Sequence, residues 1–211
     1  MALWGCRSSS KSETARPVDE TQAPQKADTR LKIVAFGNSL TAGFGADPGR
    51  SYPDYLQKEL DKRGYAWRVI NAGVSGDTTQ DGLARIAEAL QYKPAIVILE
   101  FGGNDGLRGL PVAATRTNLE QMIQELQKSG VRVVLAGMTL PPNYGPDYIG
   151  TFEKVYKDLG AKYKLPLIPF LLQGVGGNSS LMQRDGLHPT AEGNEKVAEN
   201  VMRILDPLLS H

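Results

Sequence analysis

The chain contains very little cysteine and histidine. Cys6 is the only cysteine among 211 residues, which excludes a disulfide within the chain and a CxxC metal site. The two histidines are His188 and His211, and the second is the last residue. Histidine is the side chain that most often transfers protons at neutral pH. His188 is therefore the one histidine in the body of the chain that is a candidate for such chemistry.

The sequence also lacks a strong net charge and a long apolar run. Twenty-four Lys and Arg balance 23 Asp and Glu, so the formal net charge is +1, and no long-range field favours nucleic acid or an anionic membrane. No apolar run approaches the roughly 20 residues that cross a bilayer. The 41% hydrophobic and 22% charged residues are ordinary for a globular protein, and 211 residues suit one domain with a sizeable core.

Residues 1–30 differ in composition from the rest. The segment is polar and rich in Pro and Ala, which predicts an N-terminal tether over 1–30, disordered over 7–30, ahead of a folded domain at 31–211, and the tether is a candidate remnant of a lipoprotein signal. Its LWGC stretch resembles the lipobox of bacterial lipoproteins, although no basic and apolar signal-peptide segment precedes it. Two interpretations stay open: Cys6 is a lipid-modified membrane tether, or it is an exposed cysteine that matches by chance. The first predicts an extracytoplasmic protein in a bacterium (periplasmic, secreted or lipid-anchored), and the second leaves a cytoplasmic location open.

Short apolar runs alternate with helical patterns from residue 31 onward. The runs, rich in Val and Ile, are LKIVAF (31–36), WRVIN (67–71), AIVILEF (95–101), VRVVLAG (131–137) and PLIPF (166–170). Several lack polar alternation, as do parallel strands that are covered on both faces. The apolar residues between them recur at helical spacing, as in Leu83-Ile86-Leu90, Leu119-Met122-Ile123-Leu126, Phe152-Val155-Tyr156-Leu159 and Val197-Val201-Ile204-Leu205, and an earlier helix is expected near Pro53. This order predicts a three-layer α/β/α sandwich around a parallel sheet.

In a sheet of this kind, functional residues gather in the loops after the carboxyl ends of the strands. Four such loops carry polar residues and glycines: GNSLTAG (37–43), NAGVSGDT (71–78), GGNDG (102–106) and, before the last helical pattern, RDGLHP (184–189). The first does not fit the G-x-S-x-G elbow of other serine hydrolases, because Thr41 stands where that pattern has glycine.

Together these loops offer the groups that acyl transfer needs. The hydroxyl of Ser39 is a weak nucleophile until a base, here His188, removes its proton. Asp185 lies three residues before His188 and is placed to orient the imidazole. The developing oxyanion needs donors, and the candidates are the amide of Asn104 and the backbone N–H groups of Ser39 and Gly73.

The blocks GNSL, NAG, GGND and DGLHP, in this order, resemble those of the SGNH (GDSL-type) hydrolases, over about Leu31 to Leu209. Stretches such as FGGNDGLRG are similar to the branch with bacterial thioesterase I, arylesterases and lysophospholipases. The resemblance implies a five-stranded parallel sheet, a triad of Ser39, His188 and Asp185, and oxyanion donors Ser39, Gly73 and Asn104. It also implies hydrolysis of short- to medium-chain acyl esters or thioesters without a metal or other cofactor.

Asn38 departs from the pattern of that family, in which aspartate precedes the serine. Asparagine keeps a carbonyl acceptor for turn hydrogen bonds but gives up the negative charge. Our hypothesis is that Asn38 is structural and compatible with catalysis, so that Asn38→Asp leaves activity within about tenfold. The nearby acidic residues Asp77, Glu100 and Asp105 have no metal-ligand spacing, and we interpret them as turn and solvated residues.

Three alternatives accompany this reading. A carbohydrate acetylesterase would have the same fold, and a binding relative without activity would keep the fold alone. A flavodoxin-like FMN module would cradle phosphate in the 37–43 loop with a helix behind it, but the first helix is expected only near Pro53.

The acyl pocket is expected to use GLRGLP (106–111) and TLPPNYGPDY (139–148), whose sequences do not define the length of the acyl chain that is bound. The sequence leaves the oligomeric state open.

Overall fold

The computed structural model describes Met1 and residues 28–209. It contains a five-stranded parallel sheet of order β2-β1-β3-β4-β5. The strands are β1 (Leu31–Gly37), β2 (Trp67–Gly73), β3 (Ile96–Glu100), β4 (Arg132–Ala136) and β5 (Leu167–Ile168). Each lies within or next to a run that the sequence predicted. The calls that residues 7–30 form a tether and that Cys6 is lipid-modified concern positions largely outside the described residues.

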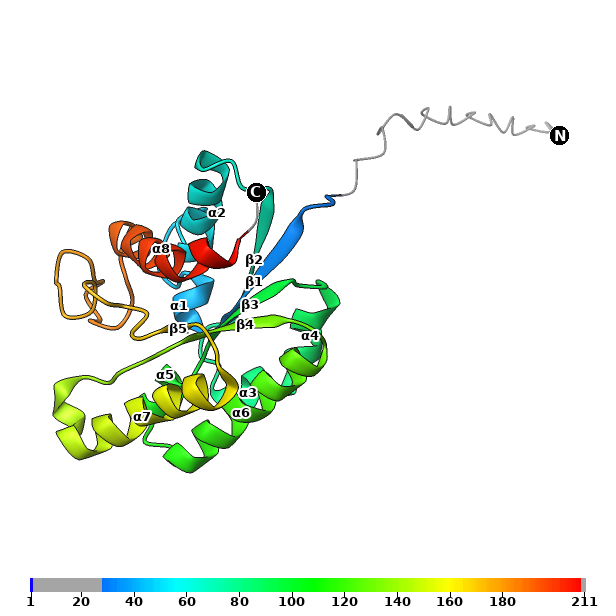
Figure 1. Ribbon diagram of the computed structural model, residues 1–211. Coiled ribbons are helices and arrows are strands. Elements are labelled where there is room, and N and C mark those ends of the chain that lie inside the picture. Colours follow the sequence, from blue (N-terminus) through cyan, green and yellow to red (C-terminus); the bar gives the residue numbers. More distant parts are fainter. Residues whose placement is uncertain (2–27, 210–211) are drawn as a thin grey trace.

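Helices cover both faces of the sheet, which gives the predicted three-layer sandwich (Figure 1). One face carries α1 (Ser39–Ala42), α2 (Tyr52–Lys62) and α8 (Ala191–Leu205). The other carries α3 (Thr79–Ala84), α4 (Ile86–Gln91), α5 (Gly103–Leu107), α6 (Val112–Lys128) and α7 (Pro146–Tyr163). Short 3-10 turns, η1 (Pro142–Tyr144) and η2 (Asp206–Leu208), precede α7 and follow α8. None of the helices in the described part of the chain is both long and apolar enough to span a bilayer.

The inner strands explain why the sheet is the centre of the core. Every residue of β3 is buried, as are residues 33–37 of β1 and 133–136 of β4. Such strands have no solvated face, which is why their sequences lack alternation. The single helix expected through Leu83, Ile86 and Leu90 is divided in two, because the backbone leaves helical geometry at Arg85 (φ −112°, ψ 16°).

Helix α1, like the five-residue α5, is an element that sequence periodicity missed. It spans only four residues, too few for a repeating apolar pattern. Asn38 caps its N-terminus, where its side-chain oxygen accepts a hydrogen bond from the N–H of Leu40 at 3.0 Å. The argument against an FMN module that rested on the absence of a helix behind the 37–43 loop is therefore wrong.

Candidate active site

Ser39 is the first residue of α1, two residues after β1 ends at Gly37. Its position in the first turn leaves its backbone N–H without an intrahelical acceptor. The residue is 9% exposed, and its hydroxyl lies at the wall of a cavity. Burial of the helix beneath it, with Leu40 7% and Thr41 0% exposed, holds the hydroxyl in one place.

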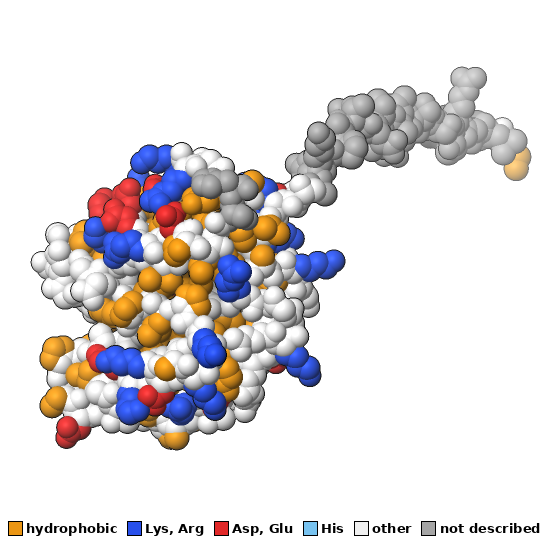
Figure 2. All heavy atoms as spheres, viewed as in Figure 1, with side chains coloured by type: hydrophobic (Ala, Val, Ile, Leu, Met, Phe, Trp, Pro, Cys, Tyr) orange, Lys and Arg blue, Asp and Glu red, His pale blue; other side chains and the backbone are white. Residues whose placement is uncertain are grey.

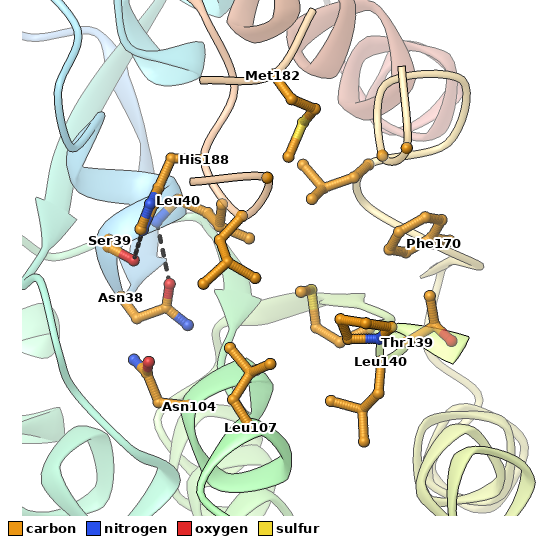
Figure 3. Close-up of a pocket in the computed structure, with 18 of the residues that line it drawn as sticks. Asn38, Ser39, Leu40, Asn104, Leu107, Thr139, Leu140, Phe170, Met182 and His188 are labelled. Atoms are coloured by element: carbon orange, nitrogen blue, oxygen red, sulfur yellow. Dashed lines mark hydrogen bonds between the residues drawn. The ribbon is translucent and has the colours of Figure 1, made fainter. Parts of the chain in front are cut away.

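A chain of hydrogen bonds joins Ser39 to the loop before α8. His188 Nε2 lies 2.8 Å from Ser39 Oγ (Figure 3), and His188 Nδ1 lies 2.6 Å from Asp185 Oδ2. Asp185 Oδ1 also accepts the N–H groups of Leu187 and His188, at 2.9 and 3.0 Å. The structure thus brings together the three side chains that the sequence proposed as a triad.

The carboxyl of Asp185 is held in its ionised form. Partial burial opposes ionisation, but hydrogen bonds from the His188 side chain and from the backbone of Leu187 and His188 lower its pKa below the usual value. An ionised carboxylate can only accept, so Nδ1 of His188 carries the proton in this contact. With Nδ1 bound to Asp185, Nε2 is the ring nitrogen that faces the Ser39 hydroxyl.

The buried carboxylate of Glu100 supports the turn that carries Ser39. Its Oε1 accepts from Asn38 Nδ2 at 2.9 Å, and its Oε2 accepts from the Asn38 N–H at 3.1 Å and from Thr41 Oγ1 at 2.9 Å. The residue is 0% exposed. Burial raises the pKa of Glu100 to about 7, against the opposing hydrogen bonds from Thr41 and Asn38.

A cavity of about 460 Å³ opens beside Ser39, His188 and Asn104. Its wall is mainly apolar, with Leu40, Leu107, Leu140, Phe170, Leu172 and Met182 among the lining side chains (Figure 3). Both loops expected to build an acyl pocket contribute, Leu107 from the first and residues 139–142 from the second. Figure 2 has the same view as Figure 1. It shows hydrophobic side chains gathered across the middle of the molecule, between the half with α2 and α8 and the half with α6 and α7.

Of the predicted oxyanion donors, Asn104 lies at the cavity and Gly73 does not. Asn104 is in the first turn of α5, and its Nδ2 donates to the Asp77 carbonyl at 2.7 Å. The amide carries a second hydrogen, which is available to a group bound in the cavity. The N–H of Gly73 donates to Asn71 Oδ1 at 3.0 Å, and a Cβ at Gly73 would lie 2.2 Å from the backbone nitrogen of Ala42. Gly73 therefore allows α1 to pack closely on β2, and the structure does not support its predicted role as a donor.

The interpretation of Asp77, Glu100 and Asp105 as turn and solvated residues is wrong. Glu100 and Asp105 are 0% and 2% exposed. Asp105 accepts the N–H of Thr79 at 2.9 Å and its hydroxyl at 2.5 Å, which joins α5 to the start of α3. The Asp77 side chain is 12% exposed and pairs with Arg85 at 2.6 Å. Within residues 28–209, no cluster of three or more His, Cys, Asp or Glu is arranged to hold a metal ion.

Glu100 is a neighbour of the site that sequence reasoning misinterpreted, although a signal for its buried role was present. It is the one charged residue in the otherwise apolar run AIVILEF. A charge at the end of a strand that is buried on both faces requires partners, because an unpaired buried charge is costly. The donors, however, come from Asn38 and Thr41, about sixty residues earlier, so only the fold reveals the pairing.

A three-layer α/β/α sandwich in which the short helix after the first strand begins with a serine, hydrogen-bonded to a histidine–aspartate pair in the loop before α8, defines the serine-hydrolase class with an SGNH-type arrangement. The chain belongs to the GDSL-like lipase/acylhydrolase family, whose model matches residues 35–196. It is accordingly an enzyme of the carboxylic ester hydrolase class.

Individual relatives agree with this assignment. The chain is 46% identical over 178 residues to Esterase TesA of Pseudomonas aeruginosa, covering 84% of this chain and 89% of the relative. It is 36% identical over 186 residues to Thioesterase 1/protease 1/lysophospholipase L1 of Escherichia coli K12, covering 88% and 86%. A crystal structure of TesA superimposes with a TM-score of 0.82 at 45% identity, over 85% of this chain and 100% of that one.

Proposed function

We propose that this protein is a serine esterase that hydrolyses short- to medium-chain acyl esters or thioesters through Ser39, His188 and Asp185. The observation that carries the proposal is the continuous contact from Asp185 through His188 to Ser39, at 2.6 and 2.8 Å, beside an apolar cavity. Both distances lie within the range required for proton transfer between a nucleophile and its base.

In the acylation step, His188 Nε2 accepts the proton of the Ser39 hydroxyl while Ser39 Oγ attacks the carbonyl carbon of the substrate. Asp185 stabilises the imidazolium that forms without taking its proton. The imidazolium then protonates the departing alcohol or thiol. A water molecule, deprotonated by the same imidazole, attacks the acyl carbonyl carbon. The Oγ–acyl bond then breaks, the imidazolium returns the proton to Ser39 Oγ, and the acid is released.

The oxyanion of both tetrahedral intermediates is proposed to accept from the Ser39 N–H and from Asn104 Nδ2. For a third donor we propose Gly76 in place of Gly73. Gly76 has φ +92°, which only glycine adopts readily, and no acceptor for its N–H is found among the described residues. It also directly precedes Asp77, whose carbonyl accepts from Asn104.

The apolar cavity supports an acyl chain as the group bound beside Ser39. Its volume of about 460 Å³ is in the range of small-molecule sites, and its wall offers a methylene chain apolar contacts. An acetylated carbohydrate, the alternative within this fold, would instead need polar partners for its hydroxyl groups. The membrane attachment and extracytoplasmic location that Cys6 would provide remain proposals.

The test combines a nucleophile variant with a chain-length series. Ser39→Ala should lower kcat on p-nitrophenyl esters by at least about 10⁴-fold and should abolish covalent labelling by a phosphonate ester. Ser75→Ala, which removes an exposed hydroxyl from a nearby loop, is the matched control. A folded Ser39→Ala protein with wild-type turnover would refute the mechanism. Faster acetate release from acetylated xylan than cleavage of any acyl ester or acyl-CoA would refute the substrate class.

A further inference from the structure

Arg85 is a charged residue that the proposed mechanism does not use, yet it contacts three segments around the site. It lies at the break between α3 and α4, and its side chain is 14% exposed. Nε donates to Asp77 Oδ2 at 2.6 Å, Nη1 donates to the Ala72 carbonyl at 3.0 Å, and Nη2 donates to the Gly37 carbonyl at 2.9 Å. Each guanidinium nitrogen therefore binds a different residue.

Two of the three acceptors, Gly37 and Asp77, lie next to the proposed catalytic groups Ser39 and Gly76, and the third lies in the strand paired with β1. Gly37 ends β1 and is two residues before Ser39. Ala72 is in the paired strand β2, opposite Phe36. Asp77 binds Arg85 through its carboxylate and binds Asn104 Nδ2 through its carbonyl, so one residue connects the guanidinium to the proposed oxyanion donor.

The environment of Arg85 fixes its plane. The guanidinium carbon lies 4.5 Å from the ring centroid of Phe36 and 5.6 Å from that of Phe101. Aromatic rings at these distances attract the cation and limit its rotation. Lysine has one ammonium on a flexible stem, so it cannot reproduce three donors in a fixed planar fork.

We propose that Arg85 is a positioning residue for ester hydrolysis. It sets the distance between the Ser39 turn and the Asn104 amide by binding the Gly37 carbonyl and Asp77 at the same time. This inference rests on the proposed function, in which Asn104 stabilises the oxyanion. Because the oxyanion exists only after Ser39 attacks, a misplaced Asn104 weakens transition-state binding and leaves substrate binding unchanged.

A double-mutant cycle between Arg85→Lys and Asn104→Ala tests the inference. Asn104→Ala should lower kcat by about 10²-fold or more. Arg85→Lys should lower kcat by about 10²-fold with KM unchanged, because small displacements of catalytic groups have effects of this size. In the Asn104→Ala background, Arg85→Lys should lower kcat by less than about threefold, since the group that Arg85 positions is already absent.

Arg116→Lys is the matched control, because Arg116 pairs with Asp158 at 2.9 Å on the surface and contacts no proposed catalytic group. Its effect should be small and equal in both backgrounds. If Arg85→Lys does not fold, Asp77→Asn, which keeps the carbonyl bound to Asn104, replaces it in the same cycle with the same expectation.

An equal loss of kcat from Arg85→Lys in both backgrounds would overturn the positioning role and leave the oxyanion role of Asn104 intact. A rise in KM without a fall in kcat would overturn it as well. Wild-type kcat in folded Asn104→Ala would instead contradict the donor role in the proposed function, on which the inference rests.

Discussion

The two sides of the Ser39 hydroxyl are built differently. On the side of the proposed nucleophile, Asn38, Thr41 and Glu100 are at most 2% exposed and belong to, or flank, the sheet and α1. On the side of the proposed base, His188 and Asp185 lie in the loop between β5 and α8, with side chains 17% and 37% exposed. The first side is fixed by hydrogen bonds within the core, and the second by hydrogen bonds within a surface loop.

Because of this difference, we expect substitutions on the two sides to have different effects on stability and on activity. Losing a partner in the core leaves buried donors unpaired, which destabilises the fold. Losing one in the loop leaves groups that water can solvate, so the fold should tolerate the change while proton transfer fails. Variants on the side of the proposed base should therefore lower kcat with little change in melting temperature. Variants of the buried residues beneath Ser39 should lower the melting temperature with a smaller change in kcat.

Among the variants that keep Ser39, the largest expected effect is that of Asp185→Asn. Asparagine keeps an oxygen for the N–H groups of Leu187 and His188 but offers the imidazole no negative charge, so kcat should fall by about 10⁴-fold. The melting temperature should fall by only a few degrees. Steady-state kinetics and thermal unfolding measure the two quantities, with exposed Asp47→Asn as the control. A folded Asp185→Asn protein with kcat within tenfold of wild type would contradict the assigned role.

The same contrast explains which residues could be predicted from the sequence. The strands were visible because β1, β3 and β4 are buried on both faces, and periodicity gave α6, α7 and α8. The residues of the proposed triad were visible because the motif around Asp185 and His188 is local: three residues apart, they meet within one loop. The buried partners around Ser39 were not visible, because Glu100 and Arg85 are defined by contacts with Asn38 and Gly37, which lie 62 and 48 residues earlier in the chain.

Gly73 illustrates a second limit of the sequence. A glycine at the end of a strand indicates that something approaches its backbone closely, but not what approaches. Here α1 occupies that space, and the side chain of Asn71 accepts the Gly73 N–H. The neighbouring Gly76 serves a different need, a positive φ, and the sequence does not distinguish the two requirements.

The next largest effect is expected for Glu100→Ala, on the buried side. The change leaves the Asn38 N–H and Asn38 Nδ2 without their acceptor, and it leaves the Thr41 hydroxyl only its 3.3 Å contact with Tyr52 Oη. At about 1–3 kcal/mol for each unsatisfied buried donor, the free energy of unfolding should fall by about 3 kcal/mol or more. Denaturant unfolding measures this loss, and kcat should fall far less than in Asp185→Asn. If Glu100→Ala were as stable as wild type, the buried hydrogen bonds beneath Ser39 would not contribute to stability in the way that this comparison of the two sides requires.

The titration of Glu100 gives a third expected effect. Its pKa is raised by burial to about 7, whereas an unfolded glutamate titrates near about 4.3. Between these values the native protein binds a proton that the unfolded chain has lost, so stability contributed by Glu100 declines as the pH rises from about 4.5 to 7. The decline should amount to roughly 3 kcal/mol.

Glu100→Gln is the matched variant for this pH dependence, because it keeps the shape of the side chain and removes the titration. Carboxyls with lowered pKa, such as Asp185 and Glu120, act in the opposite sense but are present in both proteins. The measured quantity is therefore the difference in unfolding free energy between wild type and Glu100→Gln at pH 5 and at pH 8. An equal difference at the two pH values would show that Glu100 does not titrate in this range.

The smallest effect on activity is expected for Asn38→Asp, which restores the residue usual in the family. Oδ1 of the aspartate would still cap α1, so kcat/KM should stay within about tenfold of wild type. The second carboxylate oxygen, however, would stand where Asn38 Nδ2 now lies, 2.9 Å from Glu100 Oε1. Two carboxylates at that distance do not both ionise, so the variant must retain a shared proton and should lose stability above neutral pH.

The double variant Asn38→Asp with Glu100→Gln exchanges the amide and the carboxyl. It thereby shows whether the stability loss of Asn38→Asp comes from the charge of the new side chain or from its shape. The exchange again places a donor opposite an acceptor, so it should recover most of the stability that Asn38→Asp loses at pH 8. Failure to recover would mean that the aspartate disturbs the α1 cap itself, and Asn38 would then be required for its geometry. Recovery would mean that the buried Glu100 determines which residue is tolerated before the nucleophile.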